Sequence, residues 1–366
     1  MATKIPTLAV LVVVATLCCV LADGLTIEEA RNLTAQKKMT GFIVIGDSTV
    51  DTGNNNYYPL YSVVEANFPP YGENFYDGNA TGRFCDGQLA PDYLTKYFNL
   101  GEYVPAILLL NSEKIVYSQP NASYASAGTG FDNCTPVNVW PFPDELVWFN
   151  KYVQDLSALV GNETAKETIN NAVCLFSMGT NDWIRNYFIP ENICGRALQY
   201  TVDQYADFLV RVFNQSLEIL YEGGCRRFIV YSVPATGCMP TVKAIAGNFS
   251  GKCVDRFNNA AVIHNTKIQQ ALLGFNQTHD VKTVYVSFYD LLLDAVHNSS
   301  KYGFTESSIP CCGMLLSPRA ILCNPLLLTC PDASKNVFWD SVHPTGKFYE
   351  FLANATMAAL TLHFFS

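Results

Sequence analysis

The sequence predicts an α/β fold with a central, mostly parallel sheet. Four short runs are apolar almost throughout and each is followed by small or polar residues: Gly41 to Ile45, Ala172 to Ser177, Arg227 to Ser232 and Lys282 to Phe288. Longer stretches with helical spacing lie between and after these runs. Apolar strands that alternate with helices indicate a parallel sheet covered on both faces.

Helices are predicted for four stretches: Asp144 to Leu159, Ala197 to Tyr221, Asp255 to Leu273 and Lys347 to Leu362. The second has the clearest pattern, because apolar residues recur three and four positions apart at Val202, Tyr205, Ala206, Leu209, Val212, Phe213 and Leu217. In open α/β sheets, ligands bind just beyond the carboxyl ends of the strands. Three residues directly follow predicted strands and are expected at that edge: Ser48, Asn181 and Pro234.

The N-terminus has the layout of a secretory signal peptide. Lys4 precedes a mostly apolar run from Leu8 to Leu21, and Ala22 follows. The run is shorter than the roughly 20 residues that span a bilayer. We therefore expect a signal peptide over residues 1–22 and a single domain over 23–366, with no stable membrane insertion after cleavage.

The composition is that of a globular, acidic protein. Hydrophobic residues make up 49% of the chain and charged residues 15%. Without residues 1–22 the chain has 22 basic against 32 acidic residues, because only Lys4 is lost from 23 basic residues. This balance argues against nucleic acid or an anionic membrane as the main partner. We expect a monomer.

Sequons and cysteines agree with secretion. Ten N-x-[ST] sequons are candidate glycosylation sites: Asn32, Asn79, Asn121, Asn133, Asn162, Asn214, Asn248, Asn276, Asn298 and Asn354. Eleven of the 13 cysteines remain after signal removal, without the paired spacing of a zinc site. In an oxidising compartment most are expected to form disulfides, with at least one left over. The crowded Cys311, Cys312, Cys323 and Cys330 are expected to staple a loop.

One histidine has the surroundings of a catalytic base. His343 lies in "FWDSVHPT", three residues after Asp340. A serine nucleophile needs an imidazole whose other ring nitrogen is held by a carboxylate, and Asp340 can supply it from the same loop. The alternative is a plain turn in which Asp340 caps the helix that follows. Motifs of ordinary α/β-hydrolases, zincins, phosphate-binding loops and dinucleotide folds are absent from the sequence.

Four ordered blocks resemble those of the plant GDSL esterase/lipase family, within the SGNH hydrolase superfamily. They are "GDSTVDTGNNN" from Gly46, "NASYASAGTGFDN" from Asn121, "MGTND" from Met178 and "FWDSVHPT" from Phe338. Further segments, "NATGRFCDG" from Asn79, "PATGCMP" from Pro234 and "CCG" from Cys311, extend the resemblance over nearly the whole chain after the signal. The resemblance implies a three-layer, flavodoxin-like α/β/α sandwich and hydrolysis of esters.

The resemblance also implies roles for particular residues. Ser48 matches the nucleophile, and Asp340 and His343 match the other triad members. Gly128 and Asn181 match donors of the oxyanion hole, although Gly130 lies two residues from Gly128 in the same block. The Ser48 backbone N–H is expected to be a third donor. This chemistry requires no cofactor and no metal.

Other polar residues in these blocks are expected to be structural. Asp47, Asp51 and Asn54 to Asn56 are typical of a tight turn that supports Ser48. Arg83 is expected in a structural ion pair, and Cys85 in a disulfide or as a buried thiol. For Asn181 a plain Asx turn is the alternative.

The leading functional prediction is a secreted, extracellular serine esterase or lipase that acts on a small-molecule or lipid ester. The first alternative is an acyltransferase, which would use the same triad with an alcohol as acceptor. The second is a catalytically silent secreted glycoprotein on the same scaffold.

Overall fold

The computed structural model describes residues 27–37, 39–60, 64–112, 119–188, 194–247, 251–313, 322–326 and 328–364. The predicted signal peptide, residues 1–22, and the Asn248 sequon lie outside these ranges. No helix within them has both the length and the apolar character needed to cross a membrane.

The core of the molecule is a five-stranded sheet in which every pairing is parallel, as predicted. The strands are arranged in the order β2-β1-β3-β4-β5, with bounds β1 Phe42–Gly46, β2 Ala122–Ser123, β3 Val173–Ser177, β4 Arg227–Tyr231 and β5 Lys282–Val286. This is the flavodoxin-like order. The short edge strand β2 was not predicted, because two residues in a stretch of small side chains carry no strand pattern.

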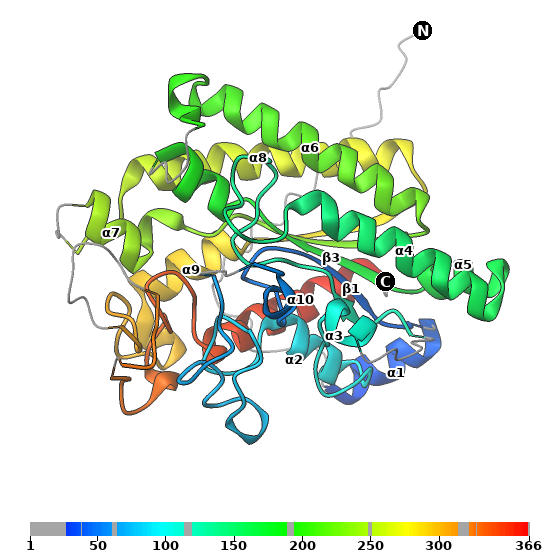
Figure 1. Ribbon diagram of the computed structural model, residues 1–366, viewed down its shortest axis with the longest axis horizontal. Helices are drawn as coiled ribbons and strands as arrows, with labels where there is room; N and C mark the ends of the chain where they lie inside the picture. Colours follow the sequence, from blue (N-terminus) through cyan, green and yellow to red (C-terminus); the bar gives the residue numbers. More distant parts are fainter. Residues whose placement is uncertain are drawn as a thin grey trace, which may run out of the picture.

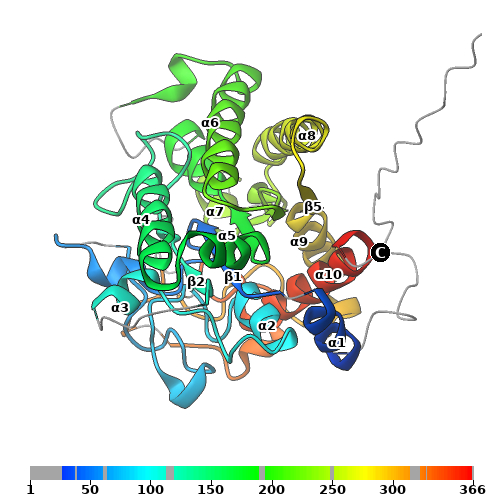
Figure 2. The ribbon, with the colours of Figure 1, turned by 90° about the vertical axis from the view of Figure 1, so that its right-hand side faces the viewer.

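Helices cover both faces of the sheet (Figures 1 and 2). One layer contains α4 (Phe142–Val160), α5 (Asn162–Asn170), α6 (Val202–Glu222) and α8 (Asp255–Thr278). The other contains α2 (Ala90–Tyr97), α9 (Phe288–His297) and α10 (Gly346–Phe364), with α1 (Ile27–Lys37) beside α2. Short helices α3 (Ile107–Ser112) and α7 (Pro240–Ala246) complete the set. The predicted three-layer α/β/α sandwich is confirmed.

Alternating side chains of β1 fill two separate cores. Ile43 and Ile45 pack with the layer of α4, α6 and α8, whereas Phe42 and Val44 pack with α2 and α10. Both faces of the strand are therefore apolar, which explains the unbroken apolar run in the sequence.

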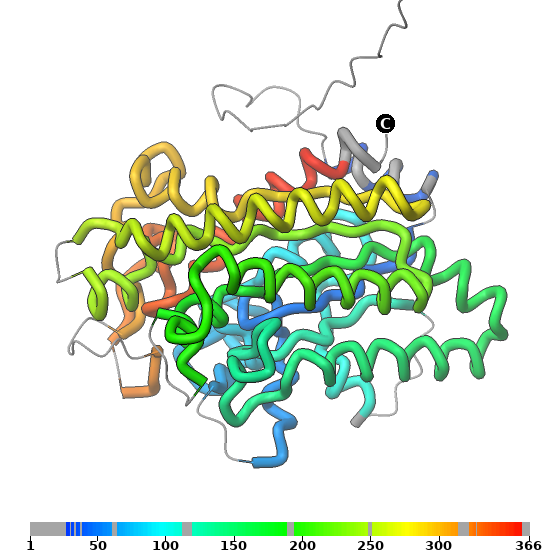
Figure 3. Tube along the Cα trace, turned by 90° about the horizontal axis from the view of Figure 1, so that it is seen from above, coloured from blue at the N-terminus to red at the C-terminus, as the bar shows by residue number. Residues whose placement is uncertain are grey.

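The longest helices, α6 and α8, lie side by side over one face (Figure 3). The sequence pattern predicted that this helix begins at Ala197, but it begins at Val202. The cause is a capping box: the Thr201 hydroxyl accepts from the Gln204 N–H, and the Gln204 side chain accepts from the Thr201 N–H. Asn214 on α6 is exposed and off the apolar stripe, as expected.

Ten cysteines form five disulfides, in the pairs Cys134–Cys194, Cys174–Cys225, Cys238–Cys253, Cys311–Cys330 and Cys312–Cys323. The last two pairs join the four crowded cysteines, as predicted. Cys85 is the unpaired cysteine among the described residues and it is buried. Burial raises the pKa of its thiol, so it stays protonated and unreactive.

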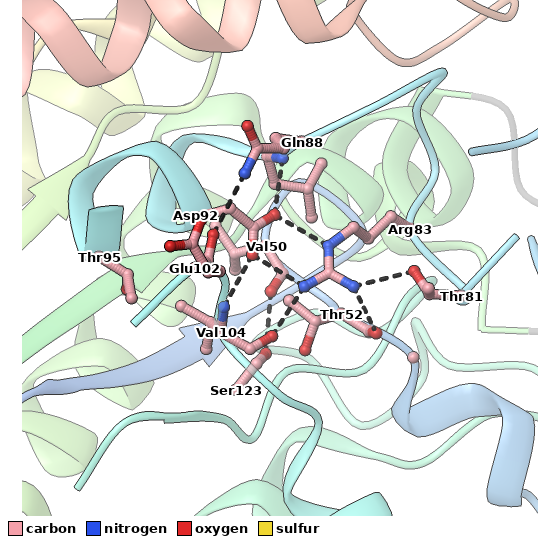
Figure 4. A network of polar contacts seen from close by, with 12 residues as sticks. Val50, Thr52, Thr81, Arg83, Gln88, Asp92, Thr95, Glu102, Val104 and Ser123 are labelled. Atoms are coloured by element: carbon pink, nitrogen blue, oxygen red, sulfur yellow. Dashed lines mark hydrogen bonds and ion pairs between the residues drawn. The ribbon is translucent and has the colours of Figure 1, made fainter. Parts of the chain in front are cut away.

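Arg83 forms the structural ion pair that the sequence analysis expected (Figure 4). Its guanidinium donates to both Asp92 carboxylate oxygens at 2.8 Å. Further bonds reach the Val104 carbonyl at 2.7 Å and the Thr81 hydroxyl at 2.8 Å. Arg83 is 3% exposed and Asp92, in α2, is fully buried. The ion pair therefore joins the segment before α2 to the helix, and the bond to Val104 joins it to the segment after the helix.

Replacing Arg83 with methionine should lower the free energy of unfolding by about 3–5 kcal/mol, because the Asp92 carboxylate would stay buried without its counter-charge. Urea unfolding followed by fluorescence measures this loss. The double variant Arg83→Met with Asp92→Asn removes both charges and should lose less than the single variant. Equal or greater loss in the double variant would contradict the assignment.

Candidate active site

Ser48 lies in the first turn after β1, at the carboxyl edge of the sheet. The strand ends at Gly46, where a Cβ atom would lie 2.1 Å from the Ser177 carbonyl oxygen of β3. Only glycine fits this close approach of two backbones. The next residue, Asp47, donates its N–H to the same carbonyl at 2.9 Å. Ser48 therefore lies just beyond the carboxyl ends of the neighbouring strands β1 and β3.

The polar residues on either side of Ser48 form the supporting turn that was predicted. Asp47 Oδ1 accepts from the Thr49 N–H at 3.0 Å, and Asp51 Oδ1 accepts from the Gly53 and Asn54 N–H groups at 2.8 Å. The same turn also contacts a distant segment of the chain, because Asn54 Nδ2 donates to the Ser123 and Ala125 carbonyls at 2.8 Å. These hydrogen bonds hold the turn against β2.

The structure brings Ser48, His343 and Asp340 together. His343 Nε2 lies 2.8 Å from Ser48 Oγ, and His343 Nδ1 lies 2.9 and 2.8 Å from the two Asp340 oxygens. All three side chains are buried. Asp340 Oδ1 also accepts from the Val342 and His343 N–H groups, so the expected turn and the carboxylate–imidazole pair coexist.

Asp340 does not cap the helix that follows. The alternative interpretation of "FWDSVHPT", a plain turn in which Asp340 caps this helix, is therefore wrong. The N–H of Gly346, the first residue of α10, donates instead to Asp86 Oδ1 at 2.8 Å. Burial acts to raise the pKa of Asp340, but the charge of His343 and hydrogen bonds from His343 and Val342 outweigh it, and the pKa is lowered. Asp340 is therefore a carboxylate that can stabilise an imidazolium.

The family resemblance implied that the backbone N–H groups of Ser48 and Gly128 are donors of an oxyanion hole. Among the hydrogen bonds of the described residues, neither the Ser48 N–H nor the Gly128 N–H donates to a protein atom. Gly128 has a φ of 85°, which favours glycine. Its neighbour Ala127 donates to Asp51 Oδ2 at 2.9 Å, which links the Gly128 segment to the nucleophile turn.

Asn181 follows β3 and contacts the same segment. Its Nδ2 atom donates to the Thr129 carbonyl at 2.9 Å, so the side chain bridges to the residue after Gly128 and does not close a plain Asx turn. An amide nitrogen has two hydrogens, which leaves one for a ligand.

Gly130 has a different neighbour from Gly128. A Cβ atom on Gly130 would lie 2.5 Å from Asp182 Oδ1. The Asp182 carboxylate accepts from the Phe131 and Asp132 N–H groups at 2.9 and 3.1 Å. Gly130 therefore permits close packing against Asp182. Its N–H, like that of Gly128, donates to no protein atom among the described residues.

Two contacts to this site were not foreseen from the sequence. The Tyr71 hydroxyl donates to Asp340 Oδ2 at 2.8 Å, and Glu145 Oε2 of α4 accepts from the Gly46 N–H at 2.9 Å. Burial raises the pKa of Glu145 well above its ordinary value. A lone tyrosine and a helical glutamate give no sequence pattern that marks such contacts.

Burial also raises the pKa of Asp47 to about 6, against the lowering effect of its bonds to Thr49. The folded protein thus holds a proton that the unfolded chain releases near pH 4. The stability from this proton is complete below that pH and is lost as pH rises through 6.

Asp47→Asn should therefore flatten the pH dependence of stability. The free energy of unfolding of the wild type should fall between pH 4 and pH 7, and loss of the Asp47 contribution accounts for up to about 3 kcal/mol of this. The melting temperature should fall with it. The variant cannot release this proton and should fall less over the same range. Calorimetry of both proteins at matched ionic strength measures the difference, and parallel curves would contradict the prediction.

The described sequon asparagines differ in exposure. Eight candidates are exposed: Asn32, Asn79, Asn133, Asn162, Asn214, Asn276, Asn298 and Asn354. Asn121 is only partly exposed, and its side-chain oxygen accepts from the Phe42 N–H at 3.2 Å and the Thr95 hydroxyl at 3.4 Å.

Chemically, the arrangement can activate a hydroxyl. A serine that contacts an imidazole, itself held by a carboxylate, can lose its proton as it attacks a carbonyl. Within the described ranges, no group of three His, Cys, Asp or Glu residues is placed to hold a metal ion.

Comparisons with known proteins identify the family of the chain. Residues 42–356 match the family model described as GDSL-like Lipase/Acylhydrolase. A GDSL esterase/lipase of Arabidopsis thaliana is 38% identical over 343 residues, 93% of each chain. A second from the same plant is 36% identical over 92% of this chain and 96% of its own length. The Arabidopsis thaliana GDSL esterase/lipase APG is 36% identical over 86% of this chain and 88% of its own.

Proposed function

The chain belongs to the GDSL-like lipase/acylhydrolase family, as its four sequence blocks predicted, and on that premise we propose that it hydrolyses carboxylic esters through an acyl-enzyme on Ser48. The observation that carries the proposal is the 2.8 Å contact between Ser48 Oγ and His343 Nε2, with Asp340 on the other ring nitrogen. The family and the names of its relatives support a carboxylic ester hydrolase.

The geometry supports the following reaction. Ser48 Oγ attacks the ester carbonyl and His343 Nε2 takes its proton, while Asp340 stabilises the imidazolium. The N–H groups of Ser48 and Gly128 and the Asn181 amide donate to the oxyanion. His343 then protonates the departing alcohol. A water molecule, deprotonated by the same imidazole, releases the acyl group and restores Ser48.

Secretion is part of the proposal. It is supported by the signal-like residues 1–22, by the exposed sequons and by five disulfides, which persist in oxidising compartments. The expected substrates are small-molecule or lipid esters.

A fluorophosphonate probe tests the nucleophile directly, because it phosphonylates activated serines. Mass spectrometry of the secreted, folded protein should locate the label on Ser48, and prior denaturation should abolish it. An unlabelled Ser48 in folded protein would overturn the proposal and favour a silent glycoprotein.

A panel of acyl esters, with and without acceptor alcohols, separates hydrolysis from transfer. Release of free acid without an acceptor supports the proposal. Products that form only when an alcohol is present would instead assign the triad to acyl transfer, because an alcohol then replaces water as the acceptor.

A further inference from the structure

The Tyr71 hydroxyl reaches the triad from a segment far from it in sequence. It donates to Asp340 Oδ2 at 2.8 Å across a separation of 269 residues. Tyr71 is 1% exposed and Asp340 is fully buried. Water therefore does not compete for this hydrogen bond, and its effect on the carboxylate is not screened by solvent.

The remaining donors to Asp340 all come from its own loop. Oδ1 accepts from the Val342 and His343 N–H groups at 2.8 and 2.7 Å, and His343 Nδ1 contacts both oxygens. Among the hydrogen bonds of the described residues, Tyr71 supplies the single donor to Asp340 from outside residues 340–343. It binds the oxygen that is not held by the loop backbone.

Ring contacts keep the phenol in place. The Tyr71 ring packs edge-on against Phe84 and Trp339, with centroid distances of 5.6 and 6.4 Å. Phe84 in turn lies 4.9 Å from the His343 ring, centroid to centroid. Its chain neighbour Arg83 is anchored by the buried ion pair with Asp92. The Tyr71–Phe84 segment thus contacts both members of the carboxylate–imidazole pair.

We propose that Tyr71 is a positioning residue of the triad, whose hydroxyl holds Asp340 and limits how strongly this carboxylate attracts a proton onto His343. The inference rests on the proposed function, because it assigns Tyr71 a role in the reaction of Ser48. A donor to a carboxylate draws negative charge away from its other partners. Without the hydroxyl, more of that charge acts on the imidazole, which favours its protonated form.

Tyr71 is suited to be a constant donor. Burial, followed by the nearby Asp340 charge, raises the pKa of its phenol well above the ordinary value, so it keeps its proton throughout the working range of an esterase. A serine or water in its place would be free to turn, whereas the phenol has a fixed direction.

The other titratable groups around the pair remain in a Tyr71 variant. Asp47 faces His343 from the nucleophile turn. Tyr349 of α10 faces Asp340, with Cys85 and Asp86 beside it. Because each of these groups is unchanged when Tyr71 is replaced, a change in the acidic limb of the pH profile reports the lost hydroxyl.

The test is the pH profile of kcat/KM for Tyr71→Phe, which keeps the ring and removes the hydroxyl. The acidic limb, which reports the free-enzyme base, should move up by about half a pH unit to one unit. At a pH below the limb, kcat/KM should then fall about three- to tenfold, with the alkaline plateau within about twofold of wild type. An unmoved limb would overturn the proposal.

Tyr231→Phe is the matched control. The Tyr231 hydroxyl, from the last residue of β4, bonds the Thr356 hydroxyl of α10 at 3.0 Å and is also buried, but within the described part of the chain it makes no hydrogen bond to Asp340. Its melting temperature should fall by a similar amount with no shift of the limb. An equal shift in both variants would show a general loss of packing and would overturn the role of Tyr71.

Should Tyr71→Phe fail to fold, 3-fluorotyrosine placed at position 71 serves instead. Fluorine makes the phenol a stronger donor, so the limb should move down, and an unmoved or rising limb would count against the proposal. Failure of the proposed function looks different: wild type would then neither take the fluorophosphonate label on Ser48 nor hydrolyse any ester.

Discussion

Replacing Ser48 with alanine is expected to lower kcat for ester hydrolysis by about 10⁴- to 10⁶-fold, because the acyl-enzyme cannot form without the hydroxyl. The His343 contact is the hydrogen bond that Ser48 Oγ makes among the described residues. Alanine should therefore leave the nucleophile turn, and the melting temperature, nearly unchanged. Steady-state kinetics on a chromogenic ester, with active-site titration of the wild type, measures the effect.

Ser341→Ala is the control for that experiment. Ser341 lies between Asp340 and His343 in sequence and is buried, but its hydroxyl has no hydrogen-bond partner among the described residues. It should retain kcat within about threefold, as expected for a change outside the reacting groups. Equal turnover by Ser48→Ala and wild type would contradict the triad assignment.

Asn181→Ala should lower kcat by about 100- to 1,000-fold, with little change in KM, since the amide would bind the oxyanion and not the ground-state ester. The same change removes the Asn181 bond to the Thr129 carbonyl, so some loss of stability is also expected. Parallel measurement of kcat, KM and melting temperature separates the two effects.

A matched asparagine isolates the oxyanion contribution. Asn56 in the nucleophile turn is exposed and donates its amide to the Thr81 carbonyl at 2.9 Å, much as Asn181 donates to Thr129. Asn56→Ala therefore removes one side-chain bond to backbone without removing an oxyanion donor. Comparable losses of kcat in both variants would assign the Asn181 effect to loop support alone.

The central strands could be predicted from the sequence because they are buried on both faces. The mostly apolar runs at β1, β3 and β4 follow from this burial, whereas β5 begins with the polar Lys282 and Thr283 and fully buries only Val284 and Val286. The edge strand β2 could not be found, since two residues give no periodicity and its place depends on pairing with β1. The segment is a strand only because it pairs with β1, which is distant in the sequence.

The same distinction applies to the site. Asp340 and His343 were visible as a pair because they share one loop, and Ser48 was visible because it follows a strand. Their meeting, across 295 residues, was expected only from the family resemblance. Tyr71 and Glu145 could not be foreseen, because a hydrogen bond between distant segments leaves no pattern around either residue.

The disulfides close short stretches of chain, whereas the triad closes a long one. Their sequence separations are 60, 51, 15, 19 and 11 residues, and the last cysteine is Cys330. A growing chain that has reached this cysteine already contains all five strands and every disulfide partner, yet lacks Asp340 and His343. Oxidation state therefore reports the maturity of the scaffold, while activity reports that the segment with Asp340 and His343 has been synthesised and has docked beside Ser48.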